Sequence, residues 1–201
     1  MNLQGERILK NLSVRSFVII GMLSSLAFIF MLIKFPIPPF PPYLTVDFSD
    51  IPALIAALIL GPTAGILVEL FKNILDYLTS GSPTGIPIGN MSNFIAGVLF
   101  ILPTYIVYKQ LKAKWGLMVS LTIGTLFMAV FMSILNYIAI LPAYIAFGGW
   151  EPMSTVALRK IVVLSVLPFN IIKGLIVAAV FLLVYKRLSN WLNKQAAYKK
   201  A

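Results

Sequence analysis

The chain has 201 residues, of which 60% are hydrophobic and 11% are charged, and its mean hydropathy is +0.95. Soluble domains carry about 25% charged residues, so this composition excludes an ordinary soluble fold and predicts a polytopic membrane protein. The formal charge of +10, from 16 basic and 6 acidic side chains, is typical of basic flanks facing an anionic cytoplasmic leaflet, an interpretation we favour over a nucleic-acid surface.

The first apolar stretch runs from residue 17 to residue 35 and follows three basic side chains, Arg7, Lys10 and Arg15. It is long enough for a bilayer core, which needs about 20 apolar residues. A signal peptide is the alternative, but no small-x-small cleavage pattern follows, and the proline-rich segment 36–42 cannot continue a helix. We therefore interpret 16–35 as a retained first span.

The next apolar stretch, 51–78, is interrupted by Gly61-Pro62. The positive-inside rule places the later cluster Lys109, Lys112 and Lys114 on the same side as the basic N-terminus, which requires an even number of spans between them. We therefore divide the stretch into helices at 50–60 and 62–79. The first is too short to cross the bilayer core, so we expect it to be tilted or buried in protein, with Asp50 as its N-cap.

Three further spans are expected at 90–109, 116–147 and 158–188. The prediction is a single transmembrane domain over 1–201, an all-α bundle of six transmembrane helices with both termini in the cytoplasm. On this topology three connections, 36–49, 79–89 and 148–158, lie at the outer face. They are rich in Gly, Pro, Asp and aromatic residues, so we expect a ligand to bind from outside.

Two missing residue types limit the chemistry. The chain has no Cys and no His, which excludes disulfides, thiolate nucleophiles and Ser-His triads and disfavours zinc sites. It also has no G-x-x-x-x-G-K-[ST] phosphate-binding loop. We expect no catalytic residues, no metal and no resident cofactor.

Polar side chains inside the spans are the strongest functional signal, because lipid offers them no hydrogen-bond partner. Glu69, Lys72 and Asp76 share one face of the third helix with Asn73. They either neutralise one another, with Lys72 pairing to Glu69 and Asp76, or form part of a site. Asn136, in the fifth helix, either bonds a neighbouring helix or contacts a ligand.

Asn170 and Lys173 lie three residues apart on one face of the sixth helix. Lys173 has no acidic residue on its own helix, so its burial needs a distant partner or a ligand oxygen, and we favour ligand contact. Pro142 and Pro168 are expected to distort their helices near these residues. Amides, an ammonium group and nearby aromatic rings suit a small, planar and polar solute. The aromatic candidates are Phe40, Tyr43, Tyr137, Tyr144, Trp150 and Phe169.

These segments resemble a known family. The motifs are Phe35-Pro36-Ile37-Pro38, Pro41-Pro42-Tyr43-Leu44-Thr45, Asp47-Phe48-Ser49-Asp50-Ile51-Pro52, Ser133-Ile134-Leu135-Asn136-Tyr137 and Pro168-Phe169-Asn170-Ile171-Ile172-Lys173-Gly174. In this order, over about residues 17–192, they resemble the riboflavin-specific substrate-binding (S) component of energy-coupling-factor (ECF) transporters.

The resemblance implies the six-helix ECF S-component fold, located in the bacterial plasma membrane. It implies that riboflavin is bound as the transported substrate, with FMN left open, and that no cofactor is used. The implied partners are membrane lipid, a transmembrane coupling protein and two ATP-binding-cassette ATPases, and no nucleic acid. The first helix would contact the coupling protein through small residues, for which Gly21 and Ser25 are the candidates. The implied riboflavin-binding residues are Tyr43, Leu44 and Thr45 in an outer loop that covers the site, with Asn136, Asn170 and Lys173.

Two other functions are compatible with parts of this sequence. A self-sufficient transporter driven by cations or protons could use Glu69 and Asp76, but such transporters tend to contain internal repeats and this sequence has none. A membrane-embedded enzyme could use the same carboxylates with Asp47 and Asp50 as acid and base. The sequence has no G-x-G-D motif and no metal-ligand cluster to support it.

Overall fold

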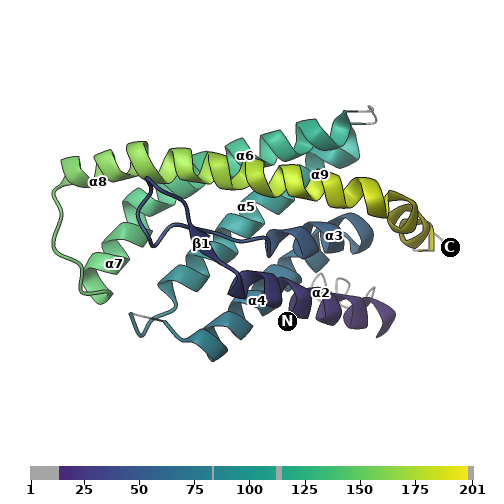
Figure 1. The fold of residues 1–201 in the computed structure, drawn as a ribbon, viewed down its shortest axis with the longest axis horizontal. Coiled ribbons are helices and arrows are strands. Elements are labelled where there is room, and N and C mark those ends of the chain that lie inside the picture. Colours follow the sequence, from purple (N-terminus) through teal and green to yellow (C-terminus); the bar gives the residue numbers. More distant parts are fainter. Residues whose placement is uncertain (1–13, 83, 112–114, 199–201) are drawn as a thin grey trace, which may run out of the picture.

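A computed structural model describes residues 14–82, 84–111 and 115–198, with side chains as far as residue 187. Figure 1 shows a bundle of helices crossed by one irregular loop. In chain order the elements are α2 Val14–Leu32, β1 Phe35–Pro36, β2 Thr45–Val46, α3 Asp50–Leu60, α4 Pro62–Ser80, α5 Ile88–Gln110, α6 Gly116–Leu135, η1 Asn136–Ile140, α7 Leu141–Phe147, α8 Thr155–Ile161, η2 Val162–Val166 and α9 Leu167–Tyr198.

Helices occupy all six predicted regions of the described chain. The segments α6, η1 and α7 form one continuous helix, and α8, η2 and α9 form another (Figure 1). The first helix ends at Leu32 rather than at residue 35, because Phe35 precedes a proline and is pushed into extended backbone. The last begins at Thr155 rather than 158, because the Ser154 hydroxyl caps it by accepting a hydrogen bond from the Ala157 amide at 3.2 Å.

The short helix α3 lies at the centre of the bundle. It has 11 residues, nine of which are buried, and it contacts α2, α4, α5 and α9. At about 1.5 Å per residue it is about 16 Å long, so burial in protein is how this short helix is accommodated. The prediction that Asp50 is the N-cap of α3 is wrong. Ser49 holds that position and makes no side-chain capping bond. The Asp50 carboxylate instead accepts a hydrogen bond from Lys72.

The division of the apolar stretch at Gly61-Pro62 is present in the structure. Gly61 has φ of 105°, a backbone conformation that favours glycine, and its amide closes α3 by donating to the Ala57 carbonyl at 3.0 Å. Pro62 then opens α4, where its missing N–H leaves no carbonyl unsatisfied.

Two of the prolines within helices, Pro142 and Pro168, follow π-helical segments, whereas Pro103 lies in the regular α-helix α5. The segment η1 ends two residues before Pro142, and η2 ends two residues before Pro168. Proline lacks an N–H and clashes with the carbonyl four residues earlier, so a wider turn relieves the conflict without ending the helix. The predicted distortions are therefore π-helical turns, one that begins at Asn136 and one that ends at Val166, shortly before Asn170.

A short β-pair was not predicted. Strands β1 and β2 are antiparallel, with Phe35 opposite Val46 and Pro36 opposite Thr45. The pair closes the base of the loop between α2 and α3, so residues 37–44 form a fixed excursion whose two ends are held together.

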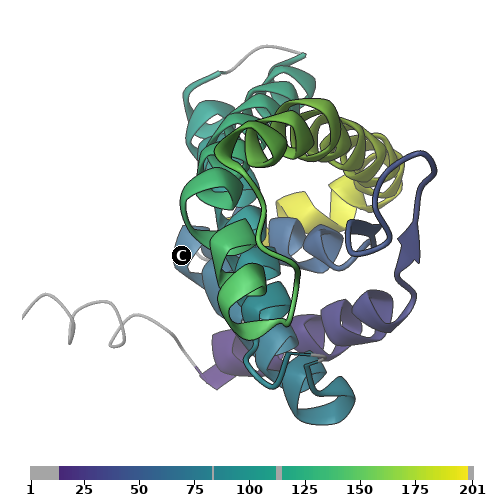
Figure 2. The same cartoon turned by 90° about the vertical axis from the view of Figure 1, so that its left-hand side faces the viewer.

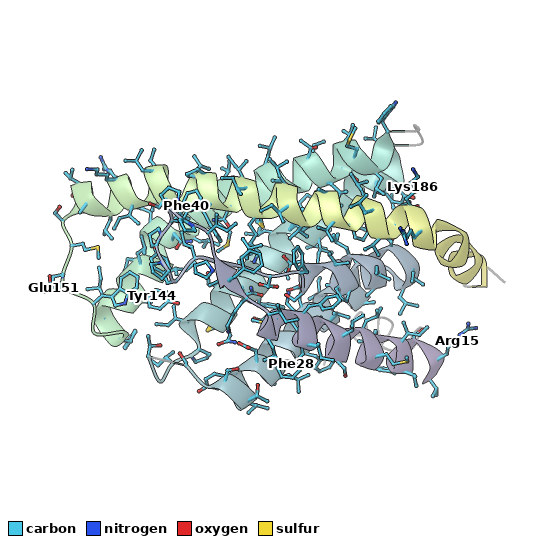
Figure 3. All side chains as sticks on the ribbon, in the orientation of Figure 1. Arg15, Phe28, Phe40, Tyr144, Glu151 and Lys186 are labelled. Carbon is cyan, nitrogen blue, oxygen red and sulfur yellow. The ribbon has the colours of Figure 1, made fainter. Side chains whose placement is uncertain are left out.

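The connections between α4 and α5 and between α7 and α8 lie at one end of the molecule (Figure 1). Figure 3 places Tyr144 and Glu151 toward that end, whereas Arg15 and Lys186 lie at the opposite end. Figure 2 is viewed from the end that carries the connections between α4 and α5 and between α7 and α8. This separation matches the predicted outer and cytoplasmic faces. The position of the termini stays a prediction, and Arg7, Lys10, Lys112 and Lys114 lie outside the described residues.

Among the described residues, four helices are long and apolar enough to cross a membrane: Val14–Leu32, Ile88–Gln110, Gly116–Phe147 and Thr155–Arg187. The charges of α4 keep it out of this group, yet its faces are arranged for lipid. Its charged and amide side chains Glu69, Lys72, Asn73 and Asp76 are buried, and its exposed side chains include Leu70, Phe71, Ile74 and Leu78. A helix with buried charges and exposed apolar side chains shows the reverse of the pattern found in soluble proteins. This pattern suits a helix surrounded by lipid. Six spans stay a prediction.

Candidate functional site

The six predicted ligand contacts line one cavity. It holds about 100 Å³ and is formed by the loop after β1, the start of α5, the region around η1 and the start of α9. Its lining residues are Tyr43, Leu44, Thr45, Gly89, Ser92, Asn93, Ala96, Met132, Asn136, Ile140, Tyr144, Phe169, Asn170 and Lys173. Groups that are far apart in the sequence thus converge on a single space.

A second cavity of about 350 Å³ adjoins the first. The two share Tyr43, Thr45, Gly89, Asn93 and Tyr144 as walls. Taken together they reach the size of small-molecule sites, which begin at about 300 Å³. The second cavity adds polar and aromatic groups from helices α4 and α5 and from the segments between helices: Lys34, Asp47, Asp76, Asn90 and Trp150.

Asn136 and Asn170 are held in the same way. Each is about 5% exposed or less, and each donates its amide nitrogen at 2.8 Å to the carbonyl four residues earlier, that of Met132 or Val166. Within the described part of the chain neither side chain bonds a neighbouring helix, the structural alternative for Asn136. Their Oδ1 atoms accept no hydrogen bond from the described residues, so each amide retains an acceptor beside the cavity.

Lys173 has the distant partner that its burial requires. Its Nζ lies 3.7 Å from Asp47 Oδ2, with side chains 6% and 2% exposed. That distance is an ion pair without a direct hydrogen bond. The ammonium therefore keeps donor capacity at the cavity wall, and both explanations considered for it, a protein partner and a ligand oxygen, are compatible with the geometry.

Lys72 is held differently. Its Nζ donates to Asp50 Oδ1 at 2.6 Å, Ser49 Oγ at 2.7 Å and Glu69 Oε1 at 2.9 Å. Three donors with three partners leave nothing for a ligand. The predicted Glu69–Lys72 pair is confirmed and is structural.

The predicted pair of Lys72 with Asp76 is wrong. Asp76 accepts a hydrogen bond from Asn90 at 2.7 Å and lies 3.6 Å from Lys34. Sequence spacing could not reveal these partners, because Asn90 is on α5 and Lys34 follows α2. Lys72 turns instead toward Asp50 at the start of α3.

Aromatic rings form one wall where the two cavities meet. Tyr144 stacks on Trp150 at 4.9 Å between ring centroids, and Tyr43 meets Trp150 edge-on at 5.0 Å. The Tyr43 hydroxyl is buried and has no hydrogen-bond partner among the described residues. Burial, reinforced by the neighbouring Tyr144, raises the pKa of Tyr43 to about 12. It is therefore a neutral donor near pH 7 with an unused hydrogen bond.

Two further predicted aromatics act outside the first cavity. Phe40 packs edge-on against Phe169 at 5.6 Å and so anchors the loop after β1 to α9. Tyr137 lies away from the cavity: Arg159 sits over its ring at 5.9 Å and donates from Nε to its hydroxyl at 3.4 Å.

The start of α5 was missed as a wall of the site. Gly89, Ser92, Asn93 and Ala96 line the first cavity, and Asn90 lines the second. The two amides were visible in the sequence at the beginning of an apolar stretch. Their position at a helix start made them resemble ordinary surface residues.

The proposed coupling positions on α2 are accessible. Gly21 and Ser25 are exposed, and a Cβ at Gly21 would meet nothing within 4 Å. Ser24 and Ala27 are instead buried against the bundle. In the described part of the chain no three His, Cys, Asp or Glu side chains are grouped to hold a metal ion.

Comparison with known proteins places this geometry in context. The profile of the family described as "ECF transporter, substrate-specific component" matches residues 15–185. The chain is 50% identical to the riboflavin transporter FmnP of Bacillus subtilis (strain 168), over 92% of this chain and 97% of that protein. It is 44% identical to the riboflavin transporter RibU of Staphylococcus aureus (strain TCH60), over 96% of this chain and all of that protein.

A solved structure is also similar to this chain. It was reported as "Structure and mechanism of the S component of a bacterial ECF transporter". The TM-score is 0.76 at 44% identity, and the match covers 89% of this chain and 97% of that one.

Proposed function

The chain belongs to the family of substrate-specific components of ECF transporters, and on this premise we propose that it captures riboflavin at the outer face of the bacterial cell membrane. Family membership makes it a multi-pass membrane transporter component and not an enzyme. The observation that carries the ligand assignment is the convergence of Asn136, Asn170 and Lys173 on one cavity with an aromatic wall.

The chemistry of riboflavin fits these groups. Its isoalloxazine rings are flat and apolar on both faces, and the Tyr43, Tyr144 and Phe169 side chains offer matching surfaces. Its ring carbonyls and ribityl hydroxyls accept hydrogen bonds, and the Lys173 ammonium and the Tyr43 hydroxyl retain free donors. Its imide N–H and hydroxyls donate, and the Oδ1 atoms of the two asparagines accept.

We further propose that the loop between β1 and β2 covers the bound ligand. Tyr43, Leu44 and Thr45 line the cavity from this loop. The pairing of β1 with β2 fixes both ends of the loop, and Phe40 fixes its middle against α9. Closure of this loop would remove the rings from water.

Transport itself is proposed to depend on other proteins. The family resemblance implies that energy comes from two ATP-binding-cassette ATPases acting through a transmembrane coupling protein, and the sequence itself has no phosphate-binding loop. The loaded component would then topple against the coupling protein and expose its site inward. A self-sufficient cation-driven transporter is not favoured by the family membership. It predicts uptake that is abolished by an uncoupler yet persists without the ATPases.

The test is riboflavin binding to the chain purified alone in detergent, followed by quenching of flavin fluorescence. We expect saturable binding, weakened about 10- to 100-fold by Asn170→Ala or Lys173→Ala, because each leaves a buried polar ligand group unpaired at about 1–3 kcal/mol. Ser120→Ala is the control. Ser120 is buried on α6, bonds its own helix and lies about 24 Å along the helix from Asn136. Absence of binding by folded, monodisperse protein would refute the assignment.

A further inference from the structure

A chain of buried polar groups connects Lys173 to the centre of the bundle. Lys72 donates to Ser49 Oγ at 2.7 Å, and the Ser49 hydroxyl in turn donates to Asp47 Oδ1. The Ser49 amide donates to the same oxygen at 2.9 Å. The other carboxylate oxygen, Asp47 Oδ2, faces Lys173. The series thus runs from α4, through the segment between β2 and α3, to α9.

Asp47 is fixed by this arrangement rather than free to rotate. Its side chain is 2% exposed, and two hydrogen bonds from Ser49 hold one oxygen. Ser49 is itself held by Lys72, which is fully buried and has all three donors occupied. The second oxygen of Asp47 is therefore presented to Lys173 from a rigid support.

Lys173 depends on this carboxylate. In the described part of the chain Asp47 is its one ion-pair partner, and the 3.7 Å separation leaves the ammonium donors free of direct hydrogen bonds. A long, flexible lysine side chain in a buried site needs a charge to hold it ionised and in one place. The Asp47 carboxylate satisfies that need from the side of the outer loop.

We propose that Asp47 is a positioning residue for riboflavin binding, which acts by holding the Lys173 ammonium at the cavity wall. This inference rests on the proposed function. It gives the loop that covers the site a second role, because the carboxylate lies one residue after β2. The loop's closing end and the ligand-contacting ammonium are thereby joined, so that displacing one displaces the other.

The experiment is a double-mutant cycle on riboflavin affinity with Asp47→Asn and Lys173→Met. Asp47→Asn alone is expected to weaken binding by about tenfold or more, the effect of removing a charged partner. In the Lys173→Met background the same change is expected to alter affinity less than twofold. Asp47→Glu, which keeps the charge, is expected to restore part of the affinity that Asp47→Asn loses.

The outcomes separate this inference from the function on which it rests. No riboflavin binding by the unaltered chain overturns both. Binding by the unaltered chain, with Asp47→Asn equally harmful in both backgrounds, overturns the positioning role and indicates that Asp47, which lines the second cavity, touches the ligand itself. Unchanged affinity in Asp47→Asn overturns it as well.

A second variant keeps the test decisive where Asp47→Asn does not fold. Ser49→Ala removes the hydroxyl that holds Asp47 and leaves the carboxylate in place. It is expected to weaken binding several-fold with Lys173 present and not to change it in Lys173→Met. An equal loss of riboflavin affinity from Ser49→Ala in the unaltered chain and in Lys173→Met would overturn the proposal.

Discussion

Lys72 and Lys173 are both buried lysines, and the number of their hydrogen-bond partners distinguishes the structural role of Lys72 from the binding role proposed for Lys173. Lys72 has three oxygen partners at 2.6–2.9 Å, whereas Lys173 has one carboxylate at 3.7 Å. An ammonium group with three satisfied donors stabilises the fold and cannot exchange a partner for a ligand without loss. One whose donors are free can accept a ligand oxygen at little cost.

This difference predicts opposite responses to the same substitution. Lys72→Met leaves the Asp50 and Glu69 carboxylates buried without a cation, and we expect it to reduce the stability of the ligand-free protein by about 3–5 kcal/mol. The measurement is thermal unfolding in detergent. Lys34→Met is the matched control: Lys34 is 42% exposed, and its pair with Asp76 is worth at most about 1 kcal/mol.

Two outcomes would count against this assignment for Lys72. One is a Lys72→Met protein that unfolds at the same temperature as the unaltered chain. The other is a loss of stability in the Lys34→Met protein as large as the loss in the Lys72→Met protein. Neutralising both carboxylates, with Asp50→Asn and Glu69→Gln added to Lys72→Met, should recover part of the lost stability.

The sequence indicated which residues line the candidate cavity better than it indicated the partners of its charged groups. Asn136, Asn170 and Lys173 stood out because polar groups inside apolar helices are rare and need a reason. Asp47 and Lys34 belong to connections between helices, where charges are ordinary, so nothing marked them as partners of Lys173 and Asp76. Pairing between distant segments depends on the packing of the whole bundle, which local spacing does not contain.

At the level of elements, the helices were predictable and the irregular segments were not. Apolar length, Gly61-Pro62 and the basic clusters were sufficient to locate six helices. The two π-helical segments arise from a proline within a helix that continues past it, and the sequence indicated only that some distortion would occur. The β1–β2 pair has two residues on each strand, too few to show any alternating pattern.

The loop between these strands yields a prediction about preorganisation. Pro41→Gly with Pro42→Gly increases the number of conformations open to the loop, and closing it over a ligand then costs more entropy. We expect riboflavin affinity to fall by about five- to thirtyfold, corresponding to about 1–2 kcal/mol. Fluorescence titration measures the affinity. Stopped-flow mixing should show that most of the change is in the dissociation rate constant.

The control for the loop variant is the same number of glycines in another outer connection that borders the site. Ser82 and Thr84 lie between α4 and α5 and line the second cavity only. Substituting both with glycine should change affinity less than the proline pair does. Wild-type affinity in the proline variant would show that the loop does not close over the ligand.

For the whole molecule, the arrangement of charge explains how one chain is both a membrane protein and a binding protein. Buried charged side chains of α3 and α4 pair with one another, and Lys173 of α9 pairs with Asp47 in the segment before α3. Many apolar side chains of the helices face outward. The cavities lie among the outer connections, and Arg15 and Lys186 lie at the opposite end (Figure 3). The cavities and these basic helix ends thus lie in different parts of the molecule.

That separation predicts that transport can be lost while binding remains. Gly21 and Ser25 form an exposed small-residue position on α2 with open space around Gly21, and neither lines a cavity of the site. Gly21→Leu with Ser25→Leu should block close approach of a partner helix, which small residues permit. We expect riboflavin affinity of the purified chain to stay within about twofold, and uptake by proteoliposomes containing the coupling protein and ATPases to fall at least tenfold.

Thr122→Leu is the matched control, because it adds similar bulk to the exposed side of α6 and should leave uptake unchanged. Equal losses in Thr122→Leu and in the α2 variant would mean that added bulk on any outer face impairs transport, and the α2 assignment would fail. Loss of binding in the α2 variant would show that this helix shapes the site. Normal uptake with normal binding would place the coupling surface on another face of the bundle.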